Sequence, residues 1–370
     1  MQKFLYITDQ DEFSDNSFIG PLFEKYLAVH FDIDIIYFSK VKEALEKKGD
    51  NKIIVPVAEK LNVLEVLENH GVDLKGYSFV TVRNDTKILK EVLKQRSTYG
   101  FKVAFRLSFP KRIAKLQIDE ANNKRSFLDI INNKIQLHQE EGLINDCDIF
   151  LPTTRKMRDD HLKGVKTRTF VIPSAIDPES LEENQHHTGE EKRFFYAGTL
   201  DKLREFETVL DAFDESEPGT FKIMISTKDP EYVEDLMAKY TNLVSFIEIY
   251  NPKDKTELLD LISKADIGLS ILPDIALFNS SVPVKVMDYY ATAIPCLMSK
   301  NETNEAVFED GKTAWMCDFD KESIKAKIHE ITSHSKQEVI DVGLNGQKRL
   351  LDIRNYKRIA DDLAHQLNIL

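Results

Sequence analysis

Residues 1–38 read MQKFLYITDQDEFSDNSFIGPLFEKYLAVHFDIDIIYF, and they hold the pattern that decides the fold. The apolar run at 4–8 predicts a short buried strand, residues 20–29 have the apolar spacing of a helix, and residues 33–38 predict a second strand. Parallel strands need a crossover connection, which is most often a helix. We therefore expect a β-α-β unit at this point in the chain.

The same alternation continues and then restarts. A segment at 182–192 that contains ENQHHTGEEK has almost no apolar residue and predicts a surface linker. Strands that alternate with helices favour a parallel sheet covered on both faces. The predicted fold is α/β, with two Rossmann-like domains facing a central cleft, one at 1–182 and one at 192–352. It remains open whether the helical pattern near the end returns residues 353–370 to the first domain. Further strands are expected at 53–57, 79–82, 103–107, 149–151 and 169–172, and after the linker at 193–197, 221–225, 244–248, 267–271 and 294–298.

Composition excludes several classes of protein. The chain has 370 residues, of which 42% are hydrophobic and 30% charged, as expected of a globular protein with about two domains. No run reaches the eighteen or so apolar residues that a membrane-spanning helix needs, and the first residues lack the apolar core of a signal peptide. The three cysteines are far apart, which predicts neither a disulfide framework nor a metal site. We expect a cytoplasmic protein.

Charge is distributed unevenly along the chain. The net charge of −12 argues against general nucleic-acid binding, which needs a basic surface. Residues 101–170 nevertheless contain 14 basic and 9 acidic residues, a net of +5, so that the remainder carries −17. A basic face of this kind is typical either of an ordinary solvated helix or of a peripheral contact with anionic lipid or a polyphosphate acceptor. Membrane association therefore stays open.

Three fragments carry a resemblance to a known family. Residues 171–177, VIPSAID, are similar to the segment before the interdomain linker of GT-B enzymes of glycosyltransferase family 4 (glycosyl transferases group 1). Residues 195–213, FYAGTLDKLREFETVLDAF, resemble that family's strand, glycine loop and helix start. Residues 279–296, NSSVPVKVMDYYATAIPC, resemble its P-x-K-x-x-E-Y-x-A-x-G-x-P signature. The three fragments occur in the order that the family requires.

The resemblance implies a retaining glycosyltransferase that moves a sugar from a UDP- or GDP-linked donor to a glycan, a lipid-linked molecule or another acceptor. Negative charge builds on the leaving diphosphate as the sugar departs, and cations or backbone amides must stabilise it. Lys285 and Arg204 are the predicted catalytic cations, and Lys202 is a further cation in the same loop. Gly198 and Thr199 form the predicted donor loop.

Other donor contacts follow from the third fragment. Asp288 stands where the family's acidic residue binds the ribose hydroxyls, because a carboxylate accepts two hydrogen bonds. Position 280 has a serine where the family has a glutamate, which leaves the activity in question. We expect donor contacts from Ser280, from the backbone of Ser281 and Val282, and from Glu305.

The first domain is expected to supply the acceptor site, because ligands gather beyond the carboxyl ends of strands in such sheets. Ser17 and Gly20 lie in the loop after the first strand, and Arg106 ends a later one. No metal-binding motif occurs, so neither a metal nor another cofactor is expected. With the donor residues in one domain and the acceptor wall in the other, donor binding is expected to favour domain closure.

Three other functions are considered for a chain with this pattern of strands and helices. A dinucleotide-dependent oxidoreductase is disfavoured, because neither half has G-x-G-x-x-G after its first strand. A sugar-nucleotide epimerase shares the same fold. A non-catalytic GT-B homologue that binds a partner enzyme would explain Ser280 and the scarcity of glycines.

Overall fold

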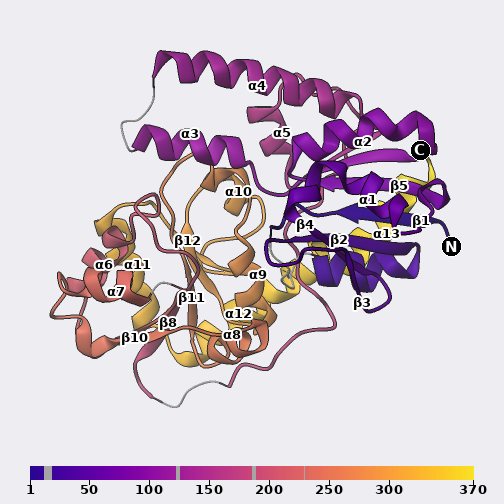
Figure 1. Cartoon of the computed structure of the whole chain (residues 1–370). Helices are drawn as coiled ribbons and strands as arrows, with labels where there is room; N and C mark the ends of the chain where they lie inside the picture. The colour runs from indigo at the N-terminus through magenta and orange to yellow at the C-terminus, as the bar shows by residue number, and fades with distance from the viewer. Residues whose placement is uncertain (12–18, 122–125, 186–188, 229) are drawn as a thin grey trace. The chain divides into compact units, whose positions relative to one another are not determined.

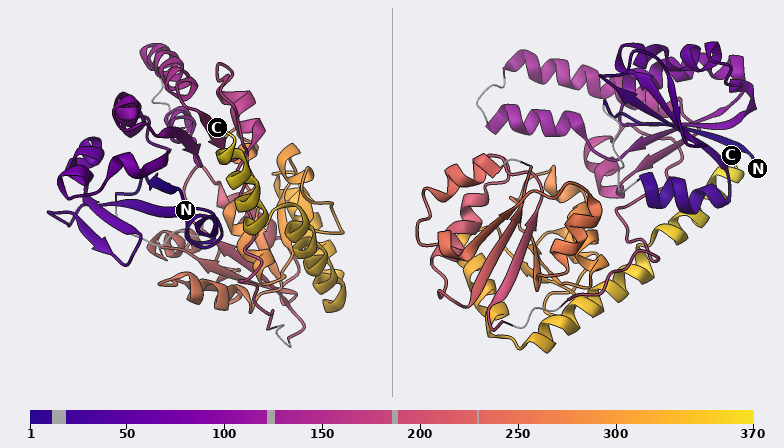
Figure 2. Two further views of the ribbon diagram at one scale, coloured as in Figure 1. Left: turned by 90° about the vertical axis from the view of Figure 1, so that its right-hand side faces the viewer. Right: turned by 60° about the horizontal axis from the view of Figure 1, so that its bottom comes forward.

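The computed structural model describes residues 1–11, 19–121, 126–185, 189–228 and 230–370. The chain forms two compact units (Figures 1 and 2). Unit 1 comprises Met1–Pro173 and Tyr356–Leu370, and unit 2 comprises Ser174–Asn355. Each unit is a largely parallel sheet covered by helices, which confirms the predicted fold class of two Rossmann-like domains. Within the described residues, no helix combines the length and the apolar character that crossing a membrane requires.

Unit 1 contains a seven-stranded sheet in the order β3-β4-β2-β1-β5-β6-β7. All neighbours are parallel except β3, which runs antiparallel to β4. Its strands are β1 Lys3–Ile7, β2 Asp32–Ser39, β3 Glu46–Lys48, β4 Lys52–Pro56, β5 Tyr77–Arg83, β6 Lys102–Leu107 and β7 Ile149–Pro152. Its helices are η1 Gly20–Tyr26, η2 Leu27–Val29, η3 Val57–Asn62, α1 Val63–Asn69, η4 Leu74–Gly76, α2 Thr86–Tyr99, α3 Lys111–Ala121, α4 Phe127–Asn145, α5 Arg155–His161 and α13 Tyr356–Asn368.

The central strand β1 shows why this sheet needs cover on both faces. Its side chains alternate between the faces, as in any strand. Leu5 and Ile7 belong to the large apolar cluster of one face. Phe4 and Tyr6 face the other way and contact the ring of Phe23 in η1, at centroid distances of 6.3 and 4.0 Å. Helix α13, from the end of the chain, packs against η1 and completes this second layer.

Unit 2 repeats the architecture with six strands in the order β10-β9-β8-β11-β12-β13, all parallel. The first strand of the unit, β8, lies in the middle of the sheet, and the chain adds strands first on one side of it and then on the other. The strands are β8 Lys192–Ala197, β9 Phe221–Ser226, β10 Ile247–Tyr250, β11 Ile267–Ser270, β12 Cys296–Ser299 and β13 Trp315–Cys317. The helices are α6 Phe206–Asp214, α7 Pro230–Met237, η5 Val244–Phe246, α8 Lys255–Ile262, η6 Phe278–Ser280, α9 Val284–Ala291, α10 Glu302–Glu305, α11 Lys321–Ser333 and α12 Lys336–Ile353.

Several local predictions differ from the structure. Residues 169–172 do not form a strand. They pair with β7 only through an isolated bridge between Thr169 and Phe150. The strand predicted at 244–248 is wrong in its first half, because Val244–Phe246 is a 3-10 turn and β10 starts at residue 247. The edge strands β3 and β13 were not predicted.

The first domain was predicted to end at residue 182, whereas the compact units divide after Pro173. Hydrogen bonds explain this division. The backbone N–H groups of Ile176, Glu182 and Gln185 donate to carbonyls of Arg354, Ala291 and Ser263, all within unit 2. The segment that precedes the polar stretch therefore belongs to unit 2.

Candidate functional site

The candidate donor site lies in unit 2, at the point where the strand order reverses. Strand β8 is followed in the chain by β9 on one side, while β11 pairs with it on the other. The connections that leave the carboxyl ends of β8 and β11 therefore diverge, and ligands of open α/β sheets bind in such a crevice. The loop that begins at Gly198 follows β8, and the segment leading to η6 and α9 follows β11.

The loop after β8 has a backbone that only glycine adopts readily. Gly198 has φ +134°, where a side chain would be strained. Its N–H donates to the carbonyl of Ser226 at 3.2 Å, and the Tyr196 hydroxyl donates to the carbonyl of Thr199 at 2.9 Å. Gly198 and Thr199 are both exposed, so this anchored turn presents its backbone to solvent.

Lys285 is the main electrostatic feature of the site. It is half-buried in the first turn of α9, and its Nζ lies 3.9 Å from the centre of the Tyr196 ring. Burial lowers the pKa of Lys285 to about 7, with a smaller contribution from the nearby positive charge of Arg204. Among the described residues, no carboxylate lies within 4.0 Å of this amine. The aromatic face stabilises the cation only in part, since such contacts contribute about 0.5–2 kcal/mol.

Arg204 approaches the same place from the turn that precedes α6. Its guanidinium forms an ion pair with Asp201 and lies 5.6 Å from the centre of the Phe278 ring in η6. The next residue, Glu205, precedes α6 with φ +45°, a left-handed conformation that is unfavourable for a residue with a Cβ. Lys202, on the same loop, is exposed.

Tyr289 and Gly268 hold α9 against the sheet. The Tyr289 hydroxyl accepts from the N–H of Ala197 and donates to the carbonyl of Leu269, each at 3.1 Å. It therefore connects the ends of β8 and β11. A Cβ on Gly268 would lie 2.2 Å from the Tyr289 ring, so only glycine lets this ring lie against β11. The position of Lys285 depends on this contact.

Asp288 lies one helical turn beyond Lys285. Its side chain is 17% exposed and forms an ion pair with Lys255 at the start of α8. Burial raises the pKa of Asp288, and the charge of Lys255 opposes that shift. The carboxylate therefore already pairs with an amine that a competing ligand would have to displace or share.

The remaining predicted donor residues occupy η6 and α10. Ser280 is buried, and its hydroxyl donates to the carbonyl of Leu277 at 2.8 Å. Ser281 is half-buried and Val282 is buried in the apolar cluster beneath α9. Glu305 lies on α10 with Lys300 Nζ 4.0 Å from its carboxylate. Helix α10 is fixed to the η6 segment because the Thr303 hydroxyl donates to the carbonyl of Asn279 at 2.6 Å.

The structure thus brings Lys285, Arg204 and Tyr196 together at the strand switch, with Asp288 on the next turn of α9. The sequence did not point to Tyr196 or Lys255 as parts of this site. Tyr196 reads as one more apolar residue of β8, and no local signal pairs Lys255 with Asp288.

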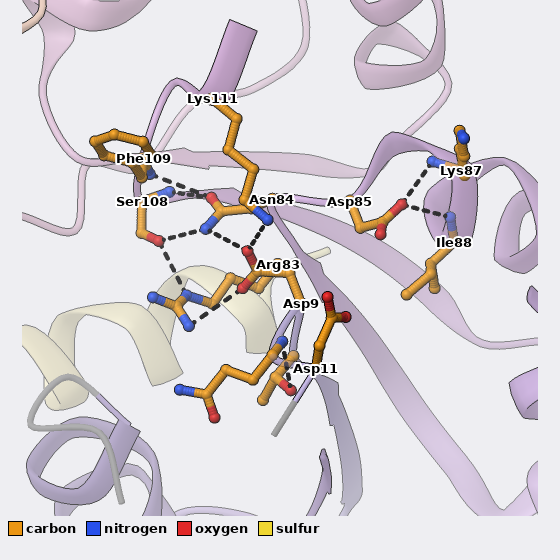
Figure 3. A network of polar contacts seen from close by, with 12 residues as sticks. Asp9, Asp11, Arg83, Asn84, Asp85, Lys87, Ile88, Ser108, Phe109 and Lys111 are labelled. Carbon is orange, nitrogen blue, oxygen red and sulfur yellow. Dashed lines mark hydrogen bonds and ion pairs between the residues drawn. The ribbon is translucent and has the colours of Figure 1, made fainter. Parts of the chain in front are cut away.

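Unit 1 has its own polar network at the equivalent strand switch, between β1 and β5 (Figure 3). Asp9 follows β1, and Arg83 NH1 and Lys111 Nζ lie 3.3 and 2.5 Å from its carboxylate oxygens. Asn84 donates to Asp9 at 3.3 Å and to the Ser108 hydroxyl at 2.9 Å. Asn84 has φ +55°, an uncommon conformation for a residue other than glycine. Asp9, Asn84 and Ser108 follow the ends of β1, β5 and β6, and the sequence did not single them out as site residues.

The three residues predicted for the acceptor side are placed differently. Ser17 lies outside the described residues. Gly20 is the first residue of the π-helical turn η1. Arg106 is 3% exposed and donates to the carbonyl of Leu151 at 2.9 Å, and burial lowers its pKa to about 10. The structure does not place Gly20 and Arg106 in the network around Asp9.

No protein-family model and no curated protein sequence matches the chain, but solved structures do. A sucrose-phosphate synthase from Thermosynechococcus elongatus superposes with a TM-score of 0.76 at 13% identity, over 99% of this chain and 98% of that one. HepE from Anabaena, in complex with UDP-glucose, gives 0.70 at 10% identity over 99% and 100%. An α,α-trehalose-phosphate synthase (UDP-forming) from Burkholderia xenovorans, in complex with glucose-6-phosphate, gives 0.64 at 9% identity over 99% and 100%. The chain therefore has the fold of GT-B glycosyltransferases along its whole length.

Proposed function

We propose that this protein is a nucleotide-sugar-dependent glycosyltransferase, with its donor site in unit 2 at the carboxyl ends of β8 and β11. The observation that carries the proposal is Lys285, a half-buried amine that meets an aromatic ring and a second cation but no carboxylate among the described residues. A site of this kind needs an anion, and the diphosphate of a nucleotide sugar supplies one. The HepE complex with UDP-glucose, on the same fold, supports a UDP-linked hexose as the donor.

The residues of unit 2 have separable roles in this proposal. Lys285 and Arg204 stabilise the charge on the departing diphosphate, and the backbone of Gly198 and Thr199 cradles a phosphate. Asp288 accepts hydrogen bonds from the ribose hydroxyls. Lys202, Ser280, Ser281, Val282 and Glu305 complete the donor contacts. GDP-linked donors remain the alternative class.

The reaction we infer is a transfer with retention and without a metal. The bond between the anomeric carbon and the diphosphate breaks, and the acceptor oxygen forms its new bond on the same face. The acceptor proton passes to a donor phosphate oxygen, so no protein base is required. Ser280 would not serve as such a base, because its hydroxyl already donates to the carbonyl of Leu277. Within the described residues, no cluster of three histidine, cysteine or acidic side chains lies close enough to hold a metal ion.

The donor proposal is tested by calorimetric titration of the full-length protein with UDP, UDP-glucose, GDP and GDP-mannose. We expect one of the two nucleotide classes to bind, and Lys285→Ala to lose most of the transfer rate while circular dichroism shows an intact fold. A charge interaction made in the transition state contributes about 3–4 kcal/mol, which predicts a rate loss of about 10²–10³-fold. Lys264→Ala is the control, because the amine of this half-buried lysine of unit 2 pairs only with Asp260 among the described residues.

Different failures of this test have different meanings. Unchanged turnover in Lys285→Ala would remove Lys285 from the site. Donor binding without transfer or hydrolysis would instead favour a non-catalytic homologue that binds a partner. A product whose anomeric configuration is inverted, as seen by NMR of the fresh product, would refute the retaining mechanism.

We further propose that unit 1 binds the acceptor and that its α3–α4 hairpin makes a peripheral membrane contact. Leu128, Ile131 and Ile135 of α4 are 74%, 42% and 52% exposed, and their spacing places them on one side of the helix. Lys134 lies beside them and is exposed as well. An apolar stripe next to a cation is typical of helices that lie on lipid surfaces. Sedimentation with anionic vesicles should fall in Ile131→Glu/Ile135→Glu, and binding equal to that of the unchanged protein would refute the contact.

A further inference from the structure

A cavity in unit 1 adjoins the polar network around Asp9 and shares Asn84 and Lys111 with it. Its volume is about 640 Å³, within the range of ordinary small-molecule sites. Helices α2, α3, α4 and α5 enclose it over the end of β6, and these helices lie together in Figure 1. Everything that lines it belongs to unit 1.

One part of the cavity wall is apolar. Leu107, Met157 and Leu162 line it and are themselves 5%, 1% and 3% exposed, so they form a rigid floor. Leu116 of α3 and Leu137 of α4 are half-buried and form facing walls. Such a lining favours the burial of hydrocarbon, with roughly 0.8 kcal/mol gained for each CH₂ removed from water.

The other part of the wall is polar, and its lysine and arginine residues outnumber its two carboxylates, Glu140 and Asp160. Lys87 and Lys90 of α2 line the cavity and are exposed, and their spacing of three places them on one side of the helix. Neither amine has an ion-pair or hydrogen-bond partner among the described residues. Lys94, one turn further along the same helix, differs in this respect because it lies 2.8 Å from Glu91 and outside the cavity.

The helix start does not supply the positive charge by itself. The N–H groups of Lys87 and Ile88 already donate to the side chain of Asp85, at 3.0 and 3.1 Å (Figure 3). An anion at this end of the cavity would therefore meet the two ammonium groups. Phe109, which is 47% exposed, also lines the cavity, and its backbone N–H donates to the side-chain oxygen of Asn84.

We propose that this cavity binds a phosphate ester of a long aliphatic alcohol. The phosphate lies against Lys87 and Lys90, and the chain lies against Leu107, Met157 and Leu162. This proposal deepens the proposed function. It rests on that function in one respect, because an amphiphile of this class would carry the sugar acceptor. The exposed stripe of α4 gives the same hairpin a surface through which such a molecule can arrive from a lipid layer.

The proposal is tested by calorimetric titration of the full-length protein with monomeric dodecyl phosphate, without any nucleotide. We expect one site per chain, with inorganic phosphate, glucose 6-phosphate and dodecyl maltoside at least about tenfold weaker, which corresponds to one unit of log Kd. Lys87→Ala/Lys90→Ala should weaken dodecyl phosphate by about tenfold or more. Lys94→Ala is the matched control and should bind as the unchanged protein does. Leu116→Gln, checked for its fold by circular dichroism, should weaken the binding of dodecyl phosphate, because it removes apolar surface that faces the alkyl chain.

Four results would overturn the proposal. Glucose 6-phosphate that binds as well as dodecyl phosphate would make this a polar sugar-phosphate site. Equal binding of inorganic phosphate would make it a simple anion site, and equal binding of dodecyl maltoside would make it a detergent-binding surface. A loss in Lys94→Ala as large as that in the double variant would show only general charge attraction.

Titration of the same samples with UDP-glucose and with GDP-mannose separates this proposal from the proposed function. If dodecyl phosphate binds and no nucleotide sugar does, the cavity stands and the donor site is refuted. If the donor binds and dodecyl phosphate does not, the cavity proposal fails alone.

Discussion

Donor binding should depend on pH because Lys285 must take up a proton to meet the diphosphate. The pKa of its amine in the free protein is about 7, against an ordinary value of 10.5. The free protein is therefore about 90% protonated at this residue at pH 6 and about 10% protonated at pH 8. A bound diphosphate adds negative charge nearby and raises the pKa of Lys285, so the bound state holds the proton across this range.

The size of the effect follows from these fractions. If only the protonated amine binds the donor, affinity falls about tenfold from pH 6 to pH 8, or about 1.4 kcal/mol. At pH 8, binding should take up about 0.9 proton per donor. The sign is fixed, because the pKa rises on binding and affinity is therefore lost as the pH increases.

The suitable ligand is UDP-glucose, because both of its phosphates are esterified and neither has the second ionisation near pH 6 of a terminal phosphate. Titrations in two buffers of different ionisation enthalpy measure the proton uptake directly. Lys285→Arg is the informative variant, because arginine stays charged throughout and should remove both the pH dependence and the proton uptake. An affinity that is constant between pH 6 and 8, with no proton uptake in the unchanged protein, would refute the assignment of Lys285 to the phosphates.

Three further predictions concern the same unit. Transfer activity should persist in EDTA, because cations of the chain occupy the role of a metal; a loss that magnesium or manganese restores would reveal a metal site. Glu205→Gly should raise the free energy of unfolding by about 0.5 kcal/mol in urea titrations, since relief of a left-handed conformation that costs about 1–2 kcal/mol exceeds the added entropy of the unfolded chain. Gly268→Ala should lower the free energy of unfolding by about 1–3 kcal/mol and weaken donor binding, because the new Cβ would collide with the Tyr289 ring. If this variant had the Tm and the donor Kd of the unchanged protein, α9 would not be held in this way.

The fold was readable from the sequence wherever buried strands have a continuous apolar run. Strands β1, β2 and β8 lie in the interior of their sheets, and their runs of apolar residues mark them clearly. The edge strands β3 and β13 lack this signal. All three residues of β3 are exposed, and β13 has only three residues, so neither has a period to detect.

The site was only partly readable, because its partners come from distant segments. Lys285 follows from a motif, whereas its contact with Tyr196 joins residues of different elements across the sheet. The same holds for the pair of Lys255 with Asp288. A rule that selects polar residues directly after each strand would have found Asp9, Asn84 and Ser108, since parallel strands end at one edge of a sheet.

The electrostatics of unit 2 give a physical reason to expect an anionic ligand between Lys285 and Arg204. Two cations held close together destabilise a folded protein unless a counter-charge is present. Asp201 pairs with Arg204 and therefore neutralises one of them. Within the described part of the chain, the ring of Tyr196 is the only contact that compensates the charge of Lys285, and burial has already lowered the pKa of this amine toward neutrality. A bound diphosphate would supply the missing charge, restore the amine to its cationic form and stabilise unit 2. The Tm of the protein should consequently rise with UDP-glucose concentration at pH 7, and the rise should be much smaller in Lys285→Ala.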